Sequence, residues 1–160
     1  ESDRFDVTRI VALAPLAYYP DEVKGQHHQL ADALEAGAMS LEELAPALLP
    51  QWYTEDYLSE HPDTQEKLTR WFESIGEDGI VESVRVDTDT PDLRSRLEKL
   101  DVPVYIRVGE EDGATPPASS REIAGLLPNA RLDVVEGVGH FLHDEDREAT
   151  LAAVEAFLGE

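Results

Sequence analysis

Short apolar runs and longer stretches of helical spacing alternate along the chain. Three mostly apolar runs, at residues 10–13, 104–108 and 132–135, are bounded by turn-forming residues. Such runs are typical of strands buried on both faces of a parallel sheet. Residues 118–127 lie between the last two runs and residues 145–158 follow them, and both stretches show helical spacing. The pattern predicts an α/β fold with parallel strands flanked by helices.

Between the first and second runs the pattern is helical, which predicts a helical insertion. Ser40 and Glu43 are spaced as a capping box that opens a helix. Pro46 lies inside that helix and should kink or shorten it. Gly76 should end a later helix, and the Thr-Pro pair at residues 90–91 should open another.

The charge balance narrows the classes of partner. The 160 residues carry 35 acidic and 13 basic side chains, a formal net charge of -22. So acidic a surface repels nucleic acid and anionic membranes, and neither is expected as a partner. No signal-peptide pattern opens the sequence and no apolar run approaches the roughly 20 residues that span a bilayer, so a cytoplasmic location is expected.

Two further readings follow from composition. Many acids with only three lysines are typical of a protein kept soluble in concentrated salt, and an ordinary acidic protein is the alternative. The absence of cysteine excludes disulfides and thiolate chemistry. The acids are spread along the chain and apolar residues make up 41%, so a folded domain is expected.

Two polar residues follow the last two apolar runs. Asp112 ends a Gly-Glu-Glu-Asp turn, and His140 ends a Gly-Val-Gly-His loop. Glu110 and Glu111 share the first loop and could take the place of Asp112. Asp112 could also serve only to close an Asx turn, and His140 could be an ordinary loop histidine.

The order strand, acid, helix, strand, histidine resembles the C-terminal end of the α/β-hydrolase fold, whose triad runs nucleophile, acid, histidine along the chain. The resemblance covers the whole chain. It implies that residues 1–18 contain the core strand after the nucleophile helix, that residues 19–86 form a helical cap, and that residues 87–160 complete the core. The stretches at residues 37–44 and 51–54 are most similar to the caps of 3-oxoadipate enol-lactonase-like hydrolases.

The resemblance also implies a chemistry. His140 would take a proton from a nucleophile and deliver it to the leaving group, and Asp112 would orient the imidazole. The substrate would be a small-molecule ester or lactone, and neither a metal nor an organic cofactor is implied. After the histidine the family usually has Glu and then Pro, whereas residues 145–147 here are Glu-Asp-Arg, so the following helix could start elsewhere.

Four aromatic residues in the helical insertion could line an apolar pocket for the acyl group, or could simply pack cap helices together. They are Trp52, Tyr53, Trp71 and Phe72.

Metal binding is not expected from the sequence. His140 and His143 lack the spacing of a helical zinc pair. Residues 87–92 are rich in Asp but lack the glycine and glutamate of a calcium-binding loop.

The nucleophile motif of this family, Gly-x-Ser-x-Gly, does not occur in the sequence. We expect it upstream of Glu1, so that the chain is the C-terminal part of a hydrolase and is inactive without its N-terminal half. An aspartate nucleophile there would indicate a dehalogenase or epoxide hydrolase instead. A third possibility is a non-catalytic binding module of the same fold. Without the N-terminal half, the strand at residues 10–13 should drive self-association into a homo-oligomer.

Overall fold

The computed structural model describes residues 6–159, so residues 1–5 of the predicted first segment and Glu160 lie outside the described part. Internal contacts divide the chain into two compact units. One unit is Tyr18–Asp92, and the other is formed by the two ends of the chain, up to Ala17 and from Leu93 onward. The assignment of residues 19–86 as a cap remains a prediction.

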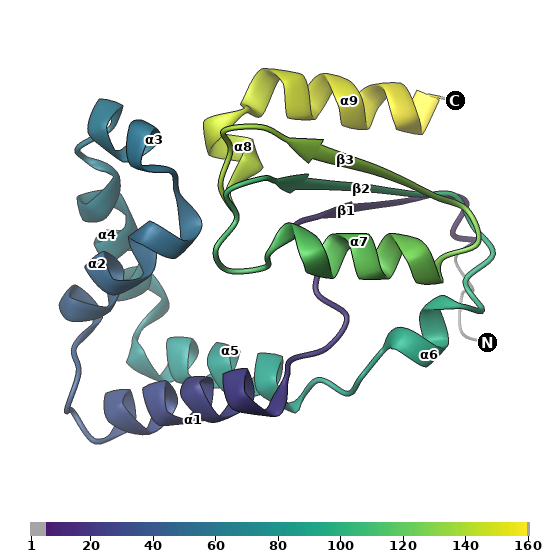
Figure 1. Cartoon of the computed structure of the whole chain (residues 1–160). Coiled ribbons are helices and arrows are strands. Elements are labelled where there is room, and N and C mark those ends of the chain that lie inside the picture. The colour runs from purple at the N-terminus through teal and green to yellow at the C-terminus, as the bar shows by residue number, and fades with distance from the viewer. Residues whose placement is uncertain (1–5, 160) are drawn as a thin grey trace. The chain divides into compact units, whose positions relative to one another are not determined.

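The unit formed by the chain ends is built on a parallel sheet (Figure 1). Its strands, in the order β1-β2-β3, are β1 (Ile10–Leu13), β2 (Val104–Gly109) and β3 (Ala130–Val135). The accompanying helices are α6 (Arg94–Leu97), α7 (Pro117–Leu126), α8 (Leu142–Glu145) and α9 (Arg147–Gly159). The predicted α/β fold with parallel strands is confirmed.

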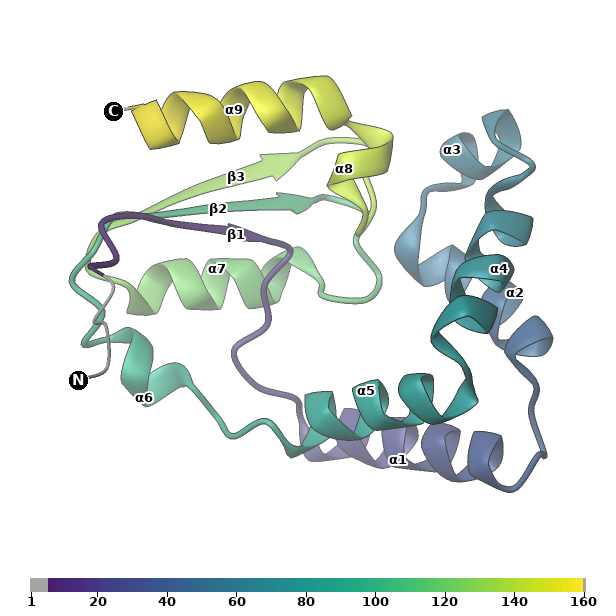
Figure 2. The same cartoon turned by 180° about the vertical axis from the view of Figure 1, so that it is seen from behind.

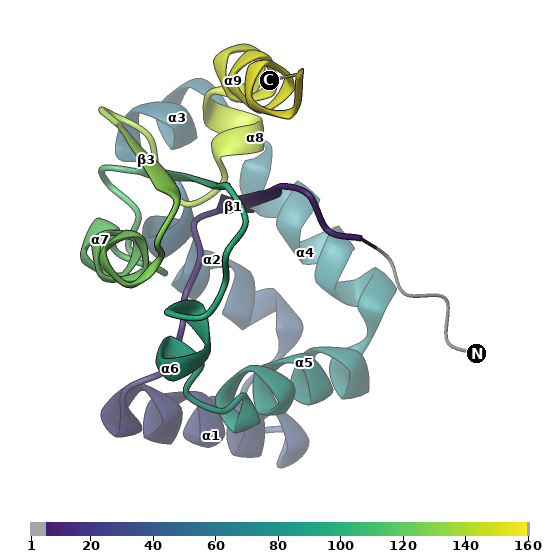
Figure 3. The same cartoon turned by 90° about the vertical axis from the view of Figure 1, so that its right-hand side faces the viewer.

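Helices α7 and α9 cover opposite faces of the sheet (Figure 3). Alternate residues of β2 point to the two faces because side chains alternate along a strand. Val104 and Ile106 pack in one core cluster with Ile123 of α7. On the other face the ring of Tyr105 lies 5.5 Å from that of Phe157 on α9. Every residue of β2 is buried, as the apolar run predicted.

The second unit is helical, and within it α1 lies beside α5 (Figure 2). Its helices are α1 (Asp21–Glu35), α2 (Leu41–Trp52), α3 (Glu55–Glu60), α4 (Thr64–Ile75) and α5 (Glu77–Asp89). The predicted capping box is confirmed: the Glu43 amide donates to Ser40 Oγ at 3.3 Å, and the Ser40 amide donates to the Glu43 carboxylate at 2.9 Å. Gly76 ends α4 as predicted, with a φ of 82° that favours glycine.

Pro46 does not shorten its helix, and the kink that the sequence also allowed stays a prediction. Helix α2 continues past both Pro46 and Pro50 to Trp52. Both prolines are exposed, so the carbonyls that they leave without an amide partner can be hydrated.

The predicted helix start at Thr90 was also wrong. Thr90 instead ends α5: its amide donates to the Asp87 carbonyl at 3.3 Å and its hydroxyl donates to the Val86 carbonyl at 2.9 Å. The next helix begins at Arg94, after the Leu93 amide donates to the Ala17 carbonyl at 3.0 Å. A contact 76 positions away in sequence (93 − 17) therefore holds the segment that the Thr-Pro pattern assigned to a helix.

The helix predicted at residues 145–158 is found as α9, which begins two residues later than expected, at Arg147. Helix α8 ends at Glu145, Asp146 has φ −137° and ψ 46°, and α9 begins at Arg147. The Asp146 carboxylate is bound by Arg107 of β2. The break therefore occurs where a side chain of the sheet holds the connection between the two helices.

Strand β1 leaves one edge of the sheet open among the described residues. It pairs with β2, and within residues 6–159 no strand pairs with its other side. The four residues carry no charge and Leu13 is 40% exposed. Such an edge is a template for pairing with another strand. We therefore expect the isolated 160-residue chain to associate as its concentration rises, as measured by sedimentation velocity. Sedimentation as a monomer at every concentration would contradict this expectation.

Nearly all charged side chains of the described residues lie at the surface. Among residues 6–159 the only buried charged side chains are Arg107 and Asp112. If the acidic excess is an adaptation to salt, the melting temperature should rise steeply from low to molar potassium chloride, because screening relieves repulsion among exposed carboxylates. An equally steep rise in uncharged sucrose would indicate general surface exclusion. A flat melting temperature in salt would leave an ordinary acidic protein.

Candidate catalytic site

Asp112 and His140 meet at the carboxyl ends of neighbouring parallel strands. Asp112 follows β2 and His140 follows β3, and the two strands pair directly. His140 Nδ1 lies 2.9 Å from Asp112 Oδ2. The Asp112 side chain is 0% exposed and that of His140 is 23% exposed. Glu110 and Glu111 are both exposed, so the residue of this loop that contacts the imidazole is Asp112.

The two carboxylate oxygens of Asp112 have different partners. Oδ1 accepts from the backbone amides of Ala114 at 2.9 Å and Thr115 at 2.7 Å, while Oδ2 faces His140. Asp112 therefore both closes its own turn and contacts His140. Because both amides hold one oxygen, the carboxylate cannot rotate away from the ring without losing hydrogen bonds that a buried anion needs.

Thr115 is a member of this site that the sequence reasoning missed. Its Oγ1 lies 2.9 Å from Asp112 Oδ2, 3.2 Å from His140 Nδ1 and 2.8 Å from the carbonyl oxygen of Ala14. Ala14 directly follows β1, so one buried hydroxyl connects the loops after all three strands. A threonine three residues after an acid suggests only a local turn, and no local pattern reveals the contacts with Ala14 and His140.

The loops that carry Asp112 and His140 touch through their backbones. The Glu110 amide donates to the Val135 carbonyl at 2.7 Å, and the Glu111 amide donates to the Val138 carbonyl at 3.0 Å. A Cβ atom at Gly109 would lie 2.1 Å from the Val138 oxygen. Only glycine allows so close an approach, and this approach sets the separation of the two loops.

The histidine loop is held at both ends. Gly137 turns the chain with a φ of 68°, a value that favours glycine. The Gly139 amide donates to Glu145 Oε1 of α8 at 3.2 Å. Within residues 6–159 His140 Nε2 has no hydrogen-bond partner, so the polar contacts of the ring are all on its Nδ1 side.

The four aromatic candidates all lie in the helical unit. The ring of Phe72 is buried and contacts both tryptophans, with centroid distances of 6.0 Å to Trp52 and 5.5 Å to Trp71. Tyr53 is buried and stacks on Tyr57 at 5.1 Å. Trp71 is 51% exposed. These contacts are those of helix packing, and a role in a substrate pocket remains a prediction.

Residues 6–159 contain neither a metal-binding cluster nor a membrane-spanning helix. No group of three or more His, Cys, Asp or Glu side chains is arranged to hold a metal ion there. None of the helices in that range has both the length and the apolar composition needed to cross a membrane.

Residues 45–147 match the profile of the family described as "alpha/beta hydrolase fold". The chain belongs to this family. The resemblance inferred from the acid turn and the histidine loop is therefore confirmed at the level of the family.

Individual relatives agree with this assignment. The chain is 24% identical over 115 residues to 3-oxoadipate enol-lactonase 2 of Acinetobacter baylyi, a match that covers 72% of this chain and 42% of the relative. Its fold is similar to that of the enol-lactonase from Burkholderia xenovorans LB400, with a TM-score of 0.81 and 26% identity over 96% of this chain and 57% of that one. A thermophilic esterase from Thermogutta terrifontis has a similar fold, with a TM-score of 0.82 and 21% identity over 94% of this chain and 55% of that one.

The chain thus spans about half the length of the relatives it matches, between 42% and 57% for these three. Its small parallel sheet and flanking helices correspond to the C-terminal part of the α/β-hydrolase fold.

Proposed function

We propose that this chain is the C-terminal portion of a hydrolase that cleaves small-molecule esters or lactones, with His140 as the general base and Asp112 as the carboxylate that orients it. The observation that carries the proposal is the 2.9 Å contact between His140 Nδ1 and the buried Asp112. A fully buried carboxylate bound to one imidazole nitrogen, with the other nitrogen unbonded, is the arrangement that activates a nucleophile.

The proposed chemistry follows from the two nitrogens of the ring. The Nδ1 proton is donated to Asp112, so the lone pair is on Nε2 and can accept the proton of an attacking hydroxyl. As that hydroxyl attacks the acyl carbon, His140 becomes positively charged and the buried carboxylate stabilises the charge. The imidazolium then returns the proton to the leaving alcohol oxygen. In the second half of the reaction His140 takes a proton from water as the water oxygen attacks the acyl carbon. The bond from that carbon to the nucleophile oxygen then breaks, and the imidazolium returns the proton to this oxygen, which releases the acid and restores the nucleophile.

The nucleophile and the amides that stabilise the oxyanion would come from a segment outside this chain. We expect that segment to precede β1. A serine there would support ester or lactone hydrolysis, and an aspartate would support cleavage of carbon–halogen bonds or epoxides. A glycine or alanine at that position would support a module that binds small molecules without hydrolysing them.

The similarity to an enol-lactonase supports esters and lactones as the class of substrate. An enol-lactonase is 26% identical to this chain over the aligned part and has a similar fold. Lactones and esters present the same acyl–oxygen bond, so one site of this kind can act on both. The breadth of the match, 96% of this chain, includes the helical unit as well as the sheet.

The test uses the complete protein that contains this chain. Its hydrolysis of p-nitrophenyl acetate and butyrate is followed by absorbance, and that of small lactones by titration of the acid released. The matched variants are His140→Ala and His143→Ala. His143 is a suitable control because its side chain is 63% exposed and lies in the same segment. Equal turnover in the two variants would exclude the proposed base.

A further inference from the structure

Arg107 is the one charged residue of the buried strand β2. It lies in the middle of β2, and its side chain is only 7% exposed. Burying a guanidinium group without partners carries a large desolvation penalty, as it does for any unpaired ion in a protein interior. The chain must therefore supply partners for it, and those partners show what the residue connects.

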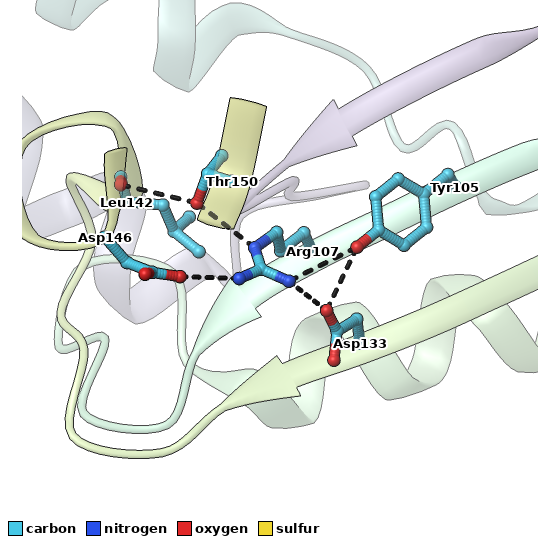
Figure 4. Close-up of polar contacts among 6 residues, drawn as sticks. All are labelled: Tyr105, Arg107, Asp133, Leu142, Asp146 and Thr150. Carbon is cyan, nitrogen blue, oxygen red and sulfur yellow. Dashed lines mark hydrogen bonds and ion pairs between the residues drawn. The ribbon is translucent and has the colours of Figure 1, made fainter. Parts of the chain in front are cut away.

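All three nitrogens of the guanidinium group are used (Figure 4). Nη1 forms an ion pair with Asp133 of β3 and donates to the hydroxyl of Tyr105 at 3.3 Å. Nη2 pairs with Asp146 Oδ2 at 2.5 Å. Nε donates to Thr150 Oγ1 of α9 at 3.1 Å. One side chain of the central strand thus binds β3, the α8–α9 junction and α9.

The partners stabilise the charged form of Arg107. Burial by itself would lower the pKa of Arg107, yet hydrogen bonds to Tyr105 and Asp146 and the charge of Asp133 raise it above its ordinary value. Two carboxylates around one guanidinium group also make the contact directional, since a planar fork of donors fits acceptors only in its own plane.

The partners of Arg107 lie on both sides of His140 along the chain. Asp133 precedes the histidine loop on β3, and Asp146 follows it at the end of α8. Thr150 also donates to the carbonyl of Leu142 at 3.4 Å, two residues after His140. Arg107 therefore holds the histidine loop on both sides, and it does so from the strand that leads into Asp112.

We propose that Arg107 and Asp146 position His140 against Asp112. The two are positioning residues: they act through α8 and the exit of the histidine loop and contact neither the substrate nor the reacting atoms. The proposal rests on the proposed function for its effect on turnover, although its effect on the geometry of His140 does not depend on that function. A small displacement of a catalytic group can cost up to about 10²-fold in rate.

The experiment replaces Asp146→Asn in the complete protein, which keeps the shape of the side chain but removes the ion pair. The control is Glu122→Gln, which removes the exposed pair between Glu122 and Arg94 (3.1 Å) in the same unit. We expect kcat for esters to fall about tenfold in Asp146→Asn with KM nearly unchanged. The downfield proton signal of His140 Nδ1–H should broaden or shift in the same variant. The control should match the wild type in both.

A second variant covers the case in which Asp146→Asn does not fold. Thr150→Val is close to isosteric and leaves both ion pairs of Arg107 in place, but removes the acceptor of Nε and the bond to the Leu142 carbonyl. It should shift the His140 Nδ1–H signal in the same direction and lower kcat by a smaller factor. A lower melting temperature with kcat and the His140 signal unchanged in the folded variants would overturn the proposal, because it would show a purely structural role.

The two proposals fail separately. If the complete protein hydrolyses no ester or lactone, the proposed function is wrong, and the NMR signal alone still decides whether Arg107 and Asp146 position the ring. If hydrolysis is present and depends on His140, but not on Asp146 or Thr150, only the positioning role is wrong.

Discussion

Replacing His140 by alanine in the complete protein should lower kcat/KM for esters and lactones by about 10⁴-fold or more. Without the imidazole, the nucleophile must lose its proton to water at neutral pH, and no group returns a proton to the leaving alcohol. His140 Nε2 has no partner among residues 6–159, while Nδ1 is held by Asp112, so the ring is oriented to do this work. The loss should appear mainly in kcat, because substrate binding does not need the base.

The control for this prediction is His143→Ala. His143 is exposed and pairs only loosely with Asp144, at 4.0 Å, so its removal should leave kcat/KM close to the wild-type value. Equal circular dichroism spectra and melting temperatures of the two variants would confirm that both are folded. Turnover by the His140 variant at the wild-type rate would remove the basis of the proposed mechanism.

The second large effect is expected from Gly109→Ala, which should destabilise the complete protein by about 3 kcal/mol or more. An added Cβ would lie 2.1 Å from the Val138 oxygen and 2.2 Å from the Gly139 oxygen. Both are backbone atoms, so no side-chain rotation relieves the clash. The histidine loop would have to move, which would break the bond from the Glu111 amide to Val138 and separate His140 from Asp112.

Urea unfolding of the variant and of Gly125→Ala measures this effect. Gly125 is an exposed residue of α7, and a Cβ atom added there would meet no neighbouring side chain or element within 4 Å. Alanine at this position should therefore stabilise the protein by about 0.5–1 kcal/mol. The two substitutions add the same methyl group and should have opposite signs. A Gly109→Ala protein as stable as the wild type would show that the two loops can separate at little cost.

Features set by neighbouring residues could be predicted well. The three strands follow from continuous apolar runs, and β3 begins only two residues earlier than expected. The Ser40–Glu43 box and the Gly76 terminus depend on groups at most four positions away, so the local pattern contains all that is needed to predict them. Helix α7 likewise follows from the helical spacing of residues 118–127, and it begins one residue earlier than expected, at Pro117.

Errors arose where a distant contact overrides the local pattern. The Thr-Pro pair at residues 90–91 is a sound helix opening by itself, but Leu93 is held in place by Ala17. The helix expected from residue 145 begins only at Arg147, after Asp146, which Arg107 binds from 39 residues away. In both cases a single long-range bond outweighs a propensity worth a fraction of a kcal/mol per residue.

The candidate site shows the same division. The sequence by itself determined which residue types follow the strands, and the motif order pointed to Asp112 and His140 through a family resemblance. Only the tertiary structure decided that their atoms meet, that Thr115 connects them to Ala14, and that Arg107 lies behind the histidine loop. The physical reason is that strand and turn preferences are properties of adjacent residues, whereas a hydrogen bond between residues 28 to 101 positions apart exists only once the parallel strands have paired.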